Sequence, residues 1–267
     1  VRHSTTGVSQ TGYDLYIRKE GQWLYAGSNA PKNKDAELVL VRNMDDSEKE
    51  CLLYLPLFSE LGRIEIGIDE GAEIEASVNP FRHRIVIFGS SFTHGTSTGR
   101  PGMSYPMIMQ RNTGLQFINL GVSGNSKLQQ SFAAIIGDNA CDAIVVDAFS
   151  NPGSEMIRER FLPFVAAIRK AHPAIPLIFL QTIYRERANF DLKERVREEE
   201  KRRAAREVFE EATEVYDDIY FVDEPDLTGT DHITSLDGTH PDDLGYWRWA
   251  NAIQPRIVKI LKKYGIR

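Results

Sequence analysis

The stretch Arg84-Ile-Val-Ile-Phe-Gly-Ser-Ser-Phe-Thr-His-Gly95 decides how the whole chain folds. Its apolar run, 85–88, has the length of a buried β-strand, and the Gly, Ser and Thr residues that follow have the composition of a turn. In α/β folds, functional side chains lie where parallel strands end. The stretch therefore predicts an exposed nucleophilic hydroxyl at the end of a buried strand. Ser91 is the first candidate and Ser90 the weaker one, and the alternative is a serine that only caps the next helix.

From residue 83 onward, the chain alternates between strand-like and helix-like segments. Apolar runs predict strands at 85–88, 116–119, 143–147, 177–181 and 220–222, and longer segments predict helices near 105–112, 127–137, 155–171, 191–216 and 242–263. We expect Pro255 to kink or split the last helix. This alternation predicts right-handed crossovers and a parallel sheet with helices on both faces.

The first 80 residues have a different pattern. Short strand-like pieces recur roughly every ten residues with turn residues between them, and they lie at 37–41, 50–55, 63–68 and 72–78. The piece at 63–68 alternates strictly between polar and apolar residues. This pattern predicts a small all-β sandwich domain over residues 1–80, followed by a second domain over residues 81–267.

Composition narrows the class of protein. The chain has 267 residues, 42% hydrophobic residues and a net charge of −6. The negative charge argues against general binding to nucleic acid, and no apolar run approaches the ~20 residues that span a bilayer. The two cysteines, Cys51 and Cys141, form no CxxC pair, so zinc and dithiol chemistry have no support. In residues 185–214, acids and bases interleave at i,i+4 spacing, which predicts a solvated helix face.

A nucleophilic serine needs a base, a group that orients the base, and donors for the oxyanion. The segment Asp237-Gly-Thr-His240 can supply the first two, since the carboxylate can reach the Nδ1–H of the imidazole and leave Nε2 as the base. The alternative is an Asp–His pair in a loop before a helix. His94 is close to Ser91 in sequence, and we expect it at the rim of the site.

Two further strand ends can supply oxyanion donors. The segment Gly121-Val-Ser123-Gly124 can turn tightly and present backbone N–H groups, and Asn151 can point its side-chain NH₂ toward the end of the sheet. For both segments the alternative is an ordinary loop or turn at the end of a strand.

Taken in order, these segments resemble the conserved blocks of the SGNH hydrolases, also called GDSL-type esterases and lipases. The matching blocks are Gly89-Ser90-Ser91, Val122-Ser123-Gly124-Asn125, Ser150-Asn151 and Asp237-Gly-Thr-His240, and the resemblance covers about residues 83–263. It implies a flavodoxin-like three-layer α/β/α parallel sheet. The implied catalytic residues are Ser91, Asp237 and His240, and the implied oxyanion hole is Ser91, Gly124 and Asn151. No metal or organic cofactor is implied.

Two positions depart from the family pattern. Ser90 stands where an aspartate is usual, and the third block has Ala-Phe-Ser-Asn in place of Gly-x-Asn-Asp. The N-terminal β region is similar in architecture to the jelly-roll accessory domain of some carbohydrate esterases.

The resemblance implies a serine esterase that hydrolyses small acyl esters, acetyl esters above all, on a carbohydrate and through an acyl-enzyme. The alternatives are a lipase, lysophospholipase or thioesterase of the same fold, or a glycan-binding protein without catalysis. We expect export to the periplasm or the outside of the cell, with which a first residue other than Met, Val1, is compatible. The substrate's acyl group, its alcohol and the oligomeric state stay open.

Overall fold

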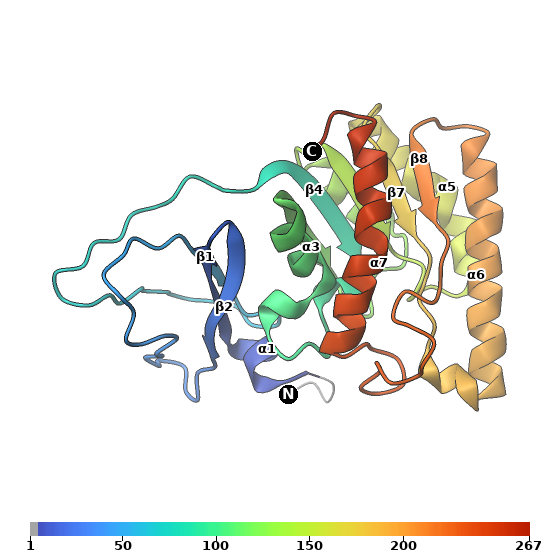
Figure 1. Cartoon of the computed structure of the whole chain (residues 1–267). Coiled ribbons are helices and arrows are strands. Elements are labelled where there is room, and N and C mark those ends of the chain that lie inside the picture. The colour runs from blue at the N-terminus through green and yellow to red at the C-terminus, as the bar shows by residue number, and fades with distance from the viewer. Residues whose placement is uncertain (1–4) are drawn as a thin grey trace.

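The computed structural model describes residues 5–267 and shows one parallel sheet beside a smaller antiparallel one (Figure 1). The parallel sheet consists of β4 (Arg82–Gly89), β5 (Leu115–Gly121), β6 (Ala143–Asp147), β7 (Leu177–Leu180) and β8 (Ile219–Val222). Its strand order is β5-β4-β6-β7-β8, and all four neighbouring pairs are parallel. In chain order this is the flavodoxin-like 2-1-3-4-5 arrangement, which confirms the predicted fold class.

Helices cover both faces of this sheet. One face packs against α3 (Tyr105–Thr113) and α7 (Asp243–Lys262), and α7 crosses in front of the strands in Figure 1. The other face packs against α4 (Gln130–Gly137), α5 (Ser154–Ala171) and α6 (Leu192–Thr213). Strand β4 shows why two cores form: Ile87 points into the α3/α7 core and Phe88 into the α4/α5/α6 core.

The predicted strands and helices of this part of the chain are present, with ends shifted by a few residues. Two features differ from the expectations. Helix α7 continues through Pro255 as one helix and is not split there. The charged face of α6 is not wholly solvated, because Glu198 and Lys201 are buried.

Residues 5–81, the N-terminal region, carry α1 (Gly7–Thr11) and a three-stranded antiparallel sheet of order β2-β1-β3. The strands are β1 (Tyr13–Lys19), β2 (Gln22–Asn29) and β3 (Cys51–Tyr54). Of the four predicted pieces only 50–55 corresponds to a strand, whereas 37–41, 63–68 and 72–78 form none. Residues 61–79 are all exposed, so the alternation at 63–68 has no partner strand and no core to bury it. The division into two domains near residue 80 stays a prediction.

The N-terminal sheet packs on the α/β region (residues 82–267) through Arg100 and Gly102, which follow the serine-containing turn after β4. The buried carboxylate of Asp14 accepts hydrogen bonds from the guanidinium of Arg100 at 2.7 Å and from the backbone N–H of Gly102 at 2.9 Å. The guanidinium of Arg111, on α3, lies 4.0 Å from the centre of the Tyr16 ring. An ion pair and cation–π contacts therefore join the two regions.

Candidate active site

The nucleophile turn lies directly after β4. Ser90 follows the last residue of the strand, Gly89, and caps α2 (Ser91–His94), because its Oγ accepts the N–H of Phe92 at 3.2 Å. A side chain at Gly89 would place its Cβ 2.0 Å from Thr93 Oγ1, so the tight turn requires glycine here. Ser91 follows at the carboxyl end of the strand, where it is 9% exposed. The structure thus gives the capping role to Ser90 and places Ser91 at the edge of the sheet.

Ser91, His240 and Asp237 form one chain of hydrogen bonds. Ser91 Oγ lies 2.8 Å from His240 Nε2, and His240 Nδ1 lies 2.8 Å from Asp237 Oδ2. The other carboxylate oxygen, Asp237 Oδ1, accepts the N–H of Thr239 at 2.9 Å and of His240 at 2.8 Å. The structure therefore brings together the three residues that the sequence predicts as catalytic, in the order that proton transfer from a serine requires.

Arg187 holds the loop that carries this pair, and the sequence analysis did not find it. Its Nε and Nη2 both donate to the carbonyl oxygen of Asp237 at 3.2 Å. Gly238 has φ of +80°, and a Cβ there would lie 2.7 Å from Arg187 Cγ. Arg187 lies in η2 (Glu186–Asn189), inside the charged segment, where no local motif separates it from its solvated neighbours.

The three predicted oxyanion donors follow the ends of three adjacent strands. Ser91 follows β4, Gly124 follows β5 with φ of +76°, and Asn151 follows β6. The oxygen of the Asn151 side chain accepts the N–H of Ser126 at 3.2 Å, which ties the second and third blocks together. Within residues 5–267, Asn151 Nδ2 donates to no other group, and this NH₂ group is therefore available to a ligand.

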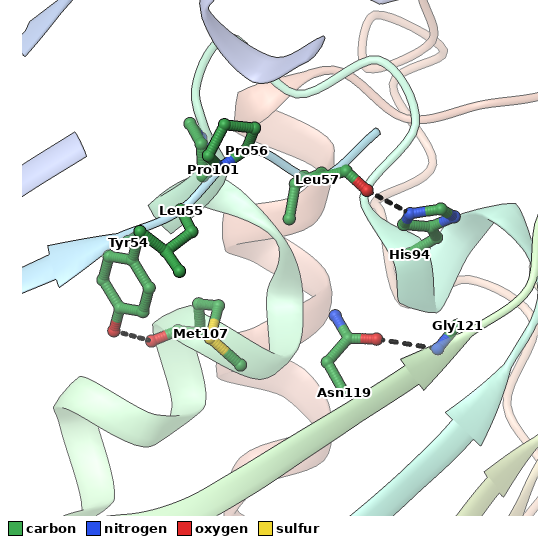
Figure 2. Close-up of a pocket in the computed structure, with 9 residues that line it drawn as sticks. All are labelled: Tyr54, Leu55, Pro56, Leu57, His94, Pro101, Met107, Asn119 and Gly121. Carbon is green, nitrogen blue, oxygen red and sulfur yellow. Dashed lines mark hydrogen bonds between the residues drawn. The ribbon is translucent and has the colours of Figure 1, made fainter. Parts of the chain in front are cut away.

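His94 connects the N-terminal region to the second block. Its Nε2 donates to the carbonyl oxygen of Leu57 at 2.5 Å, its Nδ1 lies 3.0 Å from Ser123 Oγ, and its ring packs on Phe58 at 4.0 Å. A cavity of about 300 Å³ lies beside His94 (Figure 2). The residues lining it come from both regions: Tyr54, Leu55, Pro56, Leu57, His94, Pro101, Met107, Asn119 and Gly121.

The buried carboxylate of Asp147 contacts the nucleophile turn. Asp147 ends β6, and its Oδ2 accepts hydrogen bonds from Thr93 Oγ1 at 2.8 Å and from the Tyr105 hydroxyl at 3.2 Å. Burial raises the pKa of Asp147 to about 7, although these hydroxyl hydrogen bonds favour the ionised form.

Within residues 5–267, no cluster of three or more His, Cys, Asp or Glu side chains has the arrangement of a metal site. The same residues include no helix long and apolar enough to cross a membrane.

Two family profiles match the chain. The profile of the GDSL-like lipase/acylhydrolase family matches residues 82–258, and a profile for the N-terminus of SGNH-hydrolase-type esterases matches residues 2–74. No curated protein gave a match.

Solved structures resemble the chain over nearly its whole length. A protein from Bacteroides ovatus ATCC 8483, described as a GDSL-like lipase, has a TM-score of 0.96 and 42% identity over 98% of this chain and 78% of its own. A salicylyl-acyltransferase from a tetracycline biosynthetic pathway has a TM-score of 0.69 and 19% identity, over 96% and 75%. A family two carbohydrate esterase from Clostridium thermocellum, in complex with cellohexaose, has a TM-score of 0.67 and 15% identity, over 97% and 88%.

The last two likenesses show the fold alone. The profile over residues 82–258 spans more than half of the chain, and the Bacteroides ovatus protein is 42% identical. The chain therefore belongs to the GDSL-like lipase/acylhydrolase family and is a hydrolase of ester bonds.

Proposed function

We propose that this chain is a serine esterase that removes small acyl groups, acetyl above all, from a carbohydrate through an acyl-enzyme on Ser91. The observation that carries the proposal is the continuous chain from Ser91 Oγ through the His240 imidazole to the Asp237 carboxylate, with both links at 2.8 Å. This arrangement generates a nucleophile from a hydroxyl that is otherwise protonated at neutral pH.

In the first half-reaction, Ser91 Oγ attacks the acyl carbon while His240 Nε2 takes the hydroxyl proton. Asp237 keeps the imidazole oriented and stabilises the imidazolium. The oxyanion that forms is bound by the backbone N–H groups of Ser91 and Gly124 and by Asn151 Nδ2. His240 then protonates the departing alcohol oxygen. In the second half-reaction His240 activates water, the acid leaves and the Ser91 hydroxyl is restored.

The fold of the whole chain supports a carbohydrate as the alcohol. The carbohydrate esterase described above shares this fold over 97% of the chain, which includes the N-terminal region. That region reaches the site, since the Leu57 carbonyl and the Phe58 ring contact His94, three residues after the nucleophile. It therefore offers a second wall beside the end of the sheet, suited to a substrate larger than its acyl group. Export stays a prediction.

The first experiment is hydrolysis of p-nitrophenyl acetate and butyrate by the wild type, Ser91→Ala and Ser123→Ala. We expect Ser91→Ala to abolish turnover, while Ser123→Ala, the matched serine control from the second block, keeps it. His240→Ala should lower kcat by about 10⁶-fold and Asp237→Asn by about 10⁴-fold, because the base is lost in one variant and only misoriented in the other. Circular dichroism checks that each variant is folded.

Release of acetate from an acetylated oligosaccharide then tests the substrate class. Turnover that rises with acyl chain length and is absent on the oligosaccharide would favour the lipase or thioesterase alternative. Glycan binding without turnover, unchanged in Ser91→Ala, would favour a non-catalytic protein. Wild-type kcat in Ser91→Ala would refute the nucleophile assignment.

A further inference from the structure

A cluster of buried charges lies behind the third block of the site. The side chains of Glu198 and Lys201 on α6 are 1% and 4% exposed, and that of Arg185 is 9% exposed. Lys201 Nζ lies 2.6 Å from Glu198 Oε1, and Arg185 Nε lies 3.4 Å from Glu198 Oε2. Burial, with the nearby Arg185 charge, lowers the pKa of Lys201 to about 8. Replacing a buried ion pair by apolar residues of the same size is often neutral or stabilising, so the cluster is poor evidence for a role in stability alone.

Both cations of the cluster donate to one acceptor, the carbonyl oxygen of Ser150. Arg185 Nη2 lies 2.7 Å from it and Lys201 Nζ lies 2.9 Å from it. A carbonyl oxygen has two lone pairs, and these two donors use both. The carbonyl of Ser150 belongs to the same planar peptide unit as the backbone N–H of Asn151. The cluster therefore fixes the plane from which the Asn151 side chain extends.

The other connections of Asn151 are fixed as well. Pro152, which follows it, is buried and confines the backbone of Asn151 to extended conformations. The side-chain oxygen of Asn151 is held by the N–H of Ser126 at 3.2 Å. With the preceding peptide, the following ring and the amide oxygen all held, Nδ2 has one direction in which to point. An oxyanion donor works only when it lies about 2.7–3.1 Å from the developing charge.

We propose that Arg185, Glu198 and Lys201 are positioning residues that hold Asn151 Nδ2 in the oxyanion hole through the carbonyl of Ser150. The inference rests on the proposed function, since it assigns a task to residues that support one donor of that site. None of the three residues touches the substrate in this scheme. Arg185 also packs over the ring of Phe92, 5.8 Å from its centre, so Lys201 is the cleaner position to change.

The test is a double-mutant cycle between Lys201 and Asn151, with p-nitrophenyl acetate as the substrate. We expect Lys201→Met to lower kcat about tenfold with KM within about twofold, because a displaced donor loses part of the ~10²–10³-fold effect of a deleted one. In the Asn151→Ala background, Lys201→Met should have no further effect on kcat. The matched control is Lys193→Met, an exposed lysine on the same helix, which should match the wild type.

Three results would overturn the proposal. An equal fractional loss of kcat with and without Asn151 would show that Lys201 acts on the fold as a whole. Wild-type kcat in Lys201→Met would show that the cluster positions nothing. If thermal melts show that neither Lys201→Met nor Lys201→Gln folds, the cluster is a stability element. Wild-type kcat in Asn151→Ala alone would instead remove the donor role of Asn151 from the proposed function, and Ser91→Ala separates that result from loss of the esterase assignment.

Discussion

The α/β region and the N-terminal region are stabilised in different ways. In the α/β region, helices cover both faces of the sheet, and the strands bury apolar side chains on both sides. In residues 5–81, only three large apolar or aromatic side chains are buried: Tyr16, Tyr54 and Phe81. The N-terminal region is therefore held by its contact with the α/β region more than by a core of its own.

Asp14 in the N-terminal region and Asp147 in the α/β region are both fully buried, and they differ in their partners. Asp14 faces the Arg100 guanidinium and the N–H of Gly102, whereas among the described residues Asp147 receives hydrogen bonds only from the hydroxyls of Thr93 and Tyr105. Burial raises the pKa of both carboxyls, and for Asp14 it does so against the effect of Arg100. The N-terminal region, which has little core of its own, thus depends on a charge pair. The α/β region, with its two cores, buries Asp147 without a charge pair.

The largest loss of stability should come from breaking the ion pair between Asp14 and Arg100, which joins the two regions. We expect Asp14→Ala to lower the free energy of unfolding by about 3 kcal/mol, because it leaves the partly buried Arg100 cation without its partner. Urea denaturation at pH 7, followed by tryptophan fluorescence, measures this change. The matched control is Glu50→Ala, which removes an exposed pair with Arg18 at 3.1 Å in the same region. The control should cost under about 1 kcal/mol. Equal losses in both variants would contradict the role given to Asp14.

A smaller effect on stability should appear when the pH is changed across the range in which Asp147 titrates. Its pKa is about 7 in the folded protein. An aspartate in an unfolded chain has a pKa of about 3.9, so the folded state binds the proton more tightly. The stability that this carboxyl contributes is full below pH 4 and is lost as the pH rises through 7. Asp147→Asn keeps an acceptor oxygen but does not titrate. We expect the stability difference between variant and wild type to shift in favour of the variant by about 2 kcal/mol between pH 5.5 and 8.

Urea midpoints at several pH values measure this shift. Every other titratable group is common to both proteins, so the difference between them reports Asp147. A difference that stays constant across the pH range would mean that Asp147 is already ionised in the folded state at pH 5.5.

The same contrast between the regions explains how much of the fold the sequence predicts. The α/β strands are apolar runs because both faces are buried, and a run such as 143–147 can be located without knowing its partners. Strand β1 does not stand out, because its buried positions are Asp14 and Tyr16 and its apolar residues lie on the other face. The period-two pattern of an ordinary half-buried strand is therefore reversed there.

The residues of the candidate site also fall into two groups, those that local sequence predicts and those that it does not. Asp237 and His240 are three residues apart, and Ser91 follows a strand, so local sequence is enough to propose all three. Arg187 and Lys201 act on backbone carbonyls of the loops, at Asp237 and Ser150, which have no signature in sequence. In the charged segment, a buried lysine and an exposed one have the same kind of neighbours. Only the packing of α6 against the sheet distinguishes the buried lysine from the exposed one.

The smallest effect is expected where sequence and structure disagree most, in the alternating piece at 63–68. Ile66 is 62% exposed although the pattern predicts a buried face, whereas Ile87 in β4 is fully buried. We expect Ile66→Ala to change the free energy of unfolding by less than about 0.5 kcal/mol and Ile87→Ala, the matched control, to lower it by about 3 kcal/mol. Urea denaturation of both variants makes the comparison. A loss above about 1 kcal/mol in Ile66→Ala would exceed the range for exposed sites and show that 63–68 packs against a partner. The N-terminal region would then have a core of its own, as the alternation predicts.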